Sequence, residues 1–123
     1  MRKSAVVALL ALGFAIGMTT PTQSHHSLSV FDYDTETTVT GTVTSFVYRN
    51  PHCFLHVAVK GEDGAVTAWA VEMSAIPAMI RRGVRKSTFK AGDTVTVTVN
   101  PMRSGDTAGK FVSAIAADGK TYP

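Results

Sequence analysis

The strongest constraint on the fold is a set of segments in which β-branched or aromatic residues alternate with polar ones. Residues 38–48 are nearly all β-branched or aromatic, with Val43 on one face and Phe46 on the face of the threonines. The segments 53–60 and 94–100 alternate in the same way. A period of two residues is that of a β-strand half-buried on a core. The chain is therefore predicted to be mainly β-structure.

A glycine-bounded hairpin is predicted to join the second strand to a third. Gly64 can supply the left-handed position of a three-residue loop that pairs Gly61 with Ala65. The resulting register gives four opposed pairs, which are Phe54 with Glu72, Leu55 with Val71, His56 with Ala70 and Val57 with Trp69. A slip of one residue would turn Trp69 to the wrong face, so this register is well specified.

A short helix near Ile76–Arg82 is predicted after the third strand. Ile76 and Met79 lie on one helical stripe, Ser74 is the expected N-cap, and Gly83 is the expected end. Strands at 94–100 and 111–117 follow. An SH3-like barrel or a small sandwich also has about five strands, but neither explains this helix as well. The predicted fold is all-β with one short helix, a five-stranded OB-like antiparallel barrel. Trp69 and Cys53 are expected in its core.

The first 24 residues have the order of an export signal. Arg2 and Lys3 precede an apolar run over 5–18, and a polar stretch ends in Ser24. The run is short for a membrane span, and no transmembrane segment is expected after it. We therefore predict a signal peptide at 1–24, a single β-barrel domain with an N-terminal arm at 25–123, and a periplasmic or secreted protein.

The charge of the chain argues against a general nucleic-acid role. Of the formal net charge of +3, Arg2 and Lys3 in the predicted signal supply two, which leaves +1 for residues 25–123. A nucleic-acid-binding domain usually carries a strong basic excess. No nucleic-acid partner is therefore expected. The single cysteine, Cys53, cannot form an internal disulfide.

The four histidines form two groups that suit a transition metal. Strand parity puts His52 and His56 on one face, and the hairpin register adds Glu72 to it. A chain that begins at His25 offers an amine and an imidazole, and His26 adds a second ring. Such nitrogen donors suit Cu(II). The alternatives that need no metal are a solvated N-terminus for His25 and His26, a turn position for His52 and a partly exposed strand position for His56.

Two further hypotheses do not need a metal. In the first, an OB-type face on the second and third strands binds an oligosaccharide, an oligonucleotide or a peptide, with Phe54, Asn50, Arg81 and Arg82 as candidate contacts. In the second, the domain is an accessory subunit of a larger periplasmic or membrane complex. Catalysis is not expected, because the sequence has no nucleophile elbow, zinc-protease helix motif or phosphate-binding glycine loop.

Several short motifs together resemble a known group of proteins. They are His25-His26-Ser27, Asn50-Pro51-His52, Trp69 followed by Glu72, Arg82-Gly83, Gly92-Asp93, and Pro101 with Gly105. In this order they resemble a group of small exported bacterial proteins classed as a domain of unknown function. The resemblance covers the whole of residues 25–123. It implies a periplasmic β-barrel domain and brings no established activity or ligand.

Overall fold

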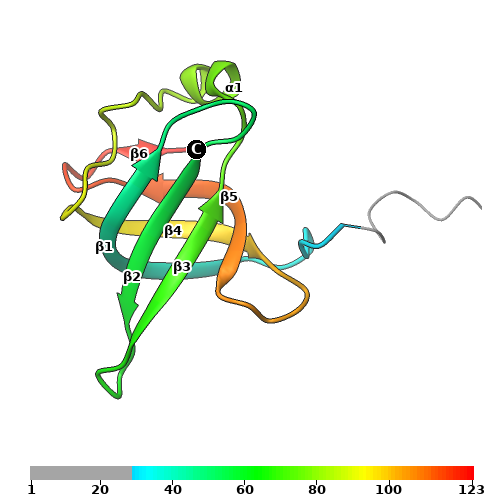
Figure 1. Cartoon of the computed structure of the whole chain (residues 1–123), viewed down its shortest axis with the longest axis vertical. Helices are drawn as coiled ribbons and strands as arrows, with labels where there is room; N and C mark the ends of the chain where they lie inside the picture. Colours follow the sequence, from blue (N-terminus) through cyan, green and yellow to red (C-terminus); the bar gives the residue numbers. More distant parts are fainter. Residues whose placement is uncertain (1–28) are drawn as a thin grey trace, which may run out of the picture.

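The computed structural model describes residues 29–123, which form a strongly bent sheet with one short helix (Figure 1). The predicted signal peptide at 1–24 and the paired histidines His25 and His26 lie outside the described residues. The elements are β1 (Thr37–Val47), β2 (Phe54–Lys60), β3 (Val66–Glu72), α1 (Ile76–Arg81), β4 (Thr94–Pro101), β5 (Ala108–Ile115) and β6 (Thr121–Tyr122).

The sheet closes on itself to form a barrel. Its strand order is β3-β2-β1-β4-β5-β6, and an additional pairing joins β3 to β5. This closing pair is parallel, whereas the other pairings are antiparallel. The closed ring contains the five strands β1 to β5, and β6 lies outside it. Five strands cannot alternate in direction all the way round a ring, so one neighbouring pair must be parallel. The OB-like barrel is confirmed, and its sheet is mixed rather than purely antiparallel.

The first strand serves both halves of the barrel because it bends. Its first half pairs with β4 and its second half with β2, and Thr42 has a partner in each. A bulge interrupts the register between Val43 and Ser45. The bulge reverses the parity of the strand, so Phe46 packs against the core. The prediction that Phe46 shares the threonine face was therefore wrong.

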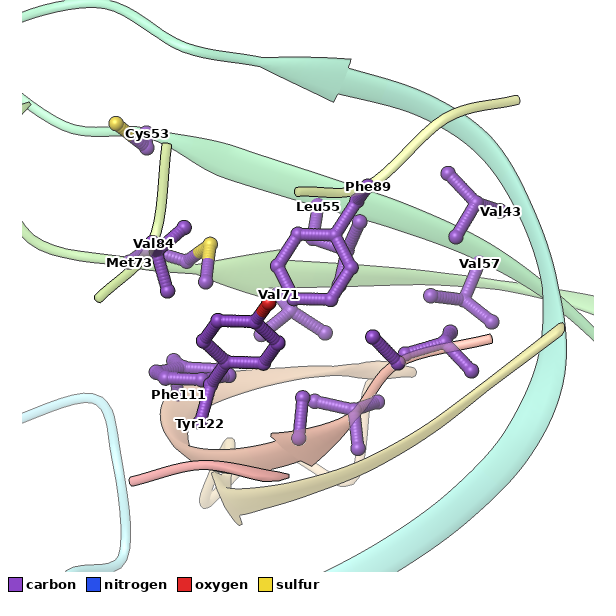
Figure 2. Packing of buried hydrophobic residues seen from close by; sticks show 14 of the residues in the cluster. Val43, Cys53, Leu55, Val57, Val71, Met73, Val84, Phe89, Phe111 and Tyr122 are labelled. Carbon is purple, nitrogen blue, oxygen red and sulfur yellow. The ribbon is translucent and has the colours of Figure 1, made fainter. Parts of the chain in front are cut away.

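The core lies inside the barrel, and its commonest residue is valine, supplied by β1, β2, β3 and β4 (Figure 2). Phe89 and Tyr122 pack edge to face, with ring centroids 5.9 Å apart. Cys53 is fully buried as predicted. Trp69 packs against this core but is only partly buried, which makes it less of an anchor than predicted.

The hairpin register agrees with the prediction at all four pairs, from Phe54 opposite Glu72 to Val57 opposite Trp69. The helix differs at its start. Its N-cap is Ala75, which makes no side-chain capping hydrogen bond, so the assignment of this role to Ser74 was wrong. Gly83 follows the helix with a φ of 81°, the left-handed conformation predicted for a glycine at a helix end.

The C-terminal region contains two features that the sequence pattern did not predict. β5 begins at Ala108 rather than at 111, and β6 pairs with its end. Gly109 lies where β5 passes between β4 and β3, and a Cβ there would come within 2.6 Å of a Val99 methyl group. Only a residue without a side chain permits this approach.

Candidate ligand-binding face

The outer face of β2 and β3 has a polar end, at His52, just before β2. Nδ1 of His52 lies 3.0 Å from Oε1 of Glu72, and Nζ of Lys110 lies 3.0 Å from the same oxygen. The lysine comes from β5, because the parallel pairing places Lys110 beside Glu72. Among the described residues, the Glu72 carboxylate therefore pairs with His52 and Lys110.

Phe54 and His56 form the middle of this face. Their rings are stacked, with centroids 6.4 Å apart and planes inclined by 19°. Both side chains are half-buried. Strand parity places His52 on the same side of the chain, as predicted, but the Phe54 ring occupies the position between the two histidines.

Beyond His56 the face is hollowed into a groove of about 370 Å³. The side chains of its floor are small, because the floor consists of Ala58, Ala68 and Ala70. These three residues share one face by parity and lie side by side in the hairpin register. His56 bounds one end and Val66 lines the other. The full lining is Thr44, Ser45, His56, Val57, Ala58, Val66, Ala68, Trp69 and Ala70.

Two of the residues predicted to contact a ligand are held by the protein itself. Oδ1 of Asn50 accepts a hydrogen bond from the backbone N–H of Ile76, at 2.9 Å. The guanidinium of Arg82 donates to the carbonyls of Val112 and Pro123 and lies 4.6 Å from the centre of the Phe111 ring. Burial lowers the pKa of Arg82.

The remaining predicted contacts are Phe54, described above, and Arg81. Arg81 is exposed at the end of α1. In Figure 1 this helix lies at the opposite end of the molecule from the β2–β3 turn. Because the groove extends from His56 toward that turn, Arg81 lies away from the groove.

Cys53 has the environment of a structural residue. Its side chain is 0% exposed and its Sγ approaches the carbonyl oxygen of Arg49 at 3.6 Å. Burial raises the pKa of the thiol, so the thiolate needed for nucleophilic chemistry is disfavoured.

The described residues place only part of the predicted metal set together. His52 and Glu72 are in contact, whereas His56 stacks on Phe54. Within residues 29–123 no group of three or more His, Cys, Asp or Glu side chains is arranged to hold a metal ion. His25 and His26 lie outside this range, so the complete set of copper ligands stays a prediction.

Sequence reasoning missed Lys110 and the groove. The pattern placed the start of β5 at residue 111, which left Lys110 outside the sheet. The three alanines of the floor gave no signal as single residues. Their alignment was implied by the hairpin register, in which Ala70 faces His56 and Ala68 faces Ala58.

Comparison with known proteins places this domain in a family. Residues 14–111 match a family of unknown function (DUF6152), and the chain belongs to that family. No protein with curated annotation matches the chain. No helix of residues 29–123 is both long enough and apolar enough to cross a membrane.

A solved structure supports the OB-fold. The barrel is similar to a mitochondrial single-stranded DNA-binding protein from S. cerevisiae, with a TM-score of 0.52 and 12% sequence identity. The match covers 67% of this chain and 92% of the other. At this identity the likeness shows the fold alone.

Proposed function

We propose that this protein is an exported, non-enzymatic binding protein whose ligand lies on the outer face of β2 and β3. The observation that carries the proposal is the groove of about 370 Å³ on that face. Small-molecule sites generally have volumes of about 300–1,000 Å³. OB-folds commonly bind their ligands on strands two and three, and here these strands supply most of the lining.

The proposed binding face lies on a rigid part of the sheet. The floor residues belong to strands paired along their whole length, with seven opposed pairs between β2 and β3. Side chains on such strands keep their places when a ligand arrives. Export rests on the charged, apolar and polar order of residues 1–24.

A titration with three classes of polymer tests this function. Isothermal titration calorimetry reports occupancy, because the single tryptophan, Trp69, faces the core beside Val57 and is a poor reporter of the outer face. The probes are a neutral trisaccharide panel, a twelve-residue oligothymidylate and a mixture of short peptides. We expect one class to give a saturable change. Ala68→Leu fills the floor and should abolish it, whereas Ala91→Leu, at an exposed alanine that does not line the groove, should not.

Two results would contradict the proposal. One is the absence of a saturable response with every class of probe. The other is binding that the Ala68→Leu variant retains unchanged, because a ligand on another surface is insensitive to the groove floor. Thermal unfolding of both variants verifies that each is folded.

Copper binding is the second candidate function, and one contact favours it. Nδ1 of His52 is held by Glu72, which leaves Nε2 available on a side chain that is 49% exposed. Metal-binding histidines commonly hold their second nitrogen against a carboxylate in this way. His25, with its amine, and His26 would supply the remaining nitrogen donors, with Glu72 orienting His52.

The position of the arm is the reason for ranking copper second. Phe31 bridges Met102, and the N–H of Arg103 donates to the carbonyl of Val30, so the arm is tied to the end of β4. At this end of the barrel, the pairings run from Pro101 of β4 to Gly109 of β5, then to Val71 of β3 and Leu55 of β2. These are three strand spacings, about 14 Å along the barrel wall. Residues 25–28 span at most about 14 Å when extended. Residues 25–28 would therefore have to be almost fully extended for His25 to reach His52.

Calorimetric titration with Cu(II) tests this candidate on protein exported and purified with its native terminus. Adding one residue before His25, or changing His52→Ala, should each weaken binding sharply. Arg49→Ala, an exposed neighbour, is the control. If both test variants bind copper as the parent does, the proposed copper site at His25, His26 and His52 does not exist.

A further inference from the structure

The groove on β1, β2 and β3 has a lining that carries no formal charge. None of its nine residues is Asp, Glu, Lys or Arg. The polar groups are the hydroxyls of Thr44 and Ser45 and the imidazole of His56, and the floor is alanine. Such a lining combines an apolar surface with a few hydrogen-bonding groups, as sites for small uncharged molecules do.

The two hydroxyls reach the groove together because of the bulge in β1. Consecutive strand residues normally point to opposite faces. Here Val43 pairs with Val57 and Ser45 pairs with His56, so Thr44 is the extra residue. Thr44 and Ser45 are both exposed. A bulge that aims two hydroxyls at one site is a device often found beside binding sites.

These hydroxyls differ from the others on the same strand. Thr38 and Thr40 each hydrogen-bond a threonine of β4, at 2.8 Å in both cases. Within residues 29–123 the side chains of Thr44 and Ser45 make no hydrogen bond. Each therefore keeps one donor and two acceptor positions for a ligand.

We propose that the groove binds a sugar ring of a neutral oligosaccharide, an inference that rests on the proposed binding function. The alanine floor suits the C–H face of the ring. Thr44, Ser45 and His56 supply donors and acceptors for its hydroxyl groups. The flat Phe54–His56 pair at the end of the groove offers a stacking surface for the next ring.

The same lining disfavours nucleic acid in this groove. Binding to single strands depends on cations that follow the phosphates, and no cation lines the groove. A peptide strand normally adds to an open sheet edge rather than to the middle of a face. The groove lies on the face centred on β2. Within residues 29–123 β3 has an open edge at Val66–Trp69, and a peptide added there would lie beside the groove rather than in it.

A calorimetric titration of the exported, purified protein tests the inference. The probes are neutral trisaccharides of glucose, mannose, galactose, xylose and N-acetylglucosamine, with trigalacturonic acid as an acidic comparison. We expect at least one neutral probe to saturate and the acidic one to bind more weakly. The double variant Thr44→Val/Ser45→Ala should lower the affinity on the order of 10-fold, because two hydrogen bonds are lost. Thr121→Val removes an exposed hydroxyl on β6 and should change nothing.

The outcomes separate this inference from the proposed function. If oligothymidylate or peptide binds in a way that Ala68→Leu abolishes while no neutral saccharide saturates, the face is a binding site and the sugar inference is wrong. If no probe binds at all, both are wrong. Saccharide binding that the double variant retains at full affinity also overturns the inference, since the hydroxyls then play no part.

Discussion

Asn50 and His52 lie in the same turn, but their side chains contact different parts of the molecule. The Asn50 side chain accepts the N–H of Ile76 at the start of α1, and the His52 side chain turns outward to Glu72. The sequence predicted the contact face of His52 because parity and hairpin register are local properties. It did not predict the role of Asn50, because its partner lies 26 residues away.

The cap by Asn50 gives a prediction about stability. Ala75, the N-cap residue, offers no side-chain acceptor, so Asn50 supplies it from outside the helix. Asn50→Ala should reduce the free energy of unfolding by about 1 kcal/mol, the usual cost of a lost helix cap. Asn50→Asp keeps the acceptor oxygen and should lose less. Urea unfolding measures both, and equal stability of the alanine variant would contradict the assigned role.

Cys53 gives a prediction about reactivity. Its side chain is 0% exposed, and burial raises the pKa of the thiol, so little thiolate exists at neutral pH. Ellman's reagent should label the native protein very slowly and label it fully and quickly in urea. Labelling of the folded protein at the rate of a free cysteine would show that the thiol is accessible.

At the scale of elements, β1 and its neighbours explain which predictions held. The alternating strands were predicted because their faces differ in polarity, and the hairpin because its glycines fix a turn. The bulge between Val43 and Ser45 was not placed, since it depends on the way β1 bends from β4 to β2. The bulge also turned Phe46 to the core and left Thr44 on the groove.

Gly41 tests the bend directly. A Cβ at this position would lie 2.3 Å from the carbonyl oxygen of Ala58 and 2.8 Å from a methyl group of Val57. Gly41→Ala should therefore destabilise the barrel by about 2 kcal/mol, as overpacking generally does. Thr42→Ala, at an exposed neighbour on the same strand, is the control for a change of side chain that creates no close contact. A Gly41→Ala variant as stable as that control would mean that β1 and β2 are farther apart.

At the scale of the whole molecule, three strands, a helix and two strands predicted an OB-like barrel, and the solved structure it resembles has that fold. What the order of elements did not reveal is how the barrel closes. The parallel β3–β5 pair brings Lys110 to Glu72, and Gly109 allows β5 to lie against β4 at the same point. Long-range pairings of this kind have no local sequence signal, so the polar end of the site was predicted only in part.

The position of the ligand is the most direct test of the account. Backbone amide shifts of the ¹⁵N-labelled protein should be recorded while the best-binding probe from the calorimetric titrations is added. We expect the largest changes at Ser45, His56, Ala58, Ala68 and Ala70, with α1 and β6 unaffected. Changes centred on α1 and the basic residues after it, with the β2–β3 face silent, would contradict the proposal that this face is the binding surface.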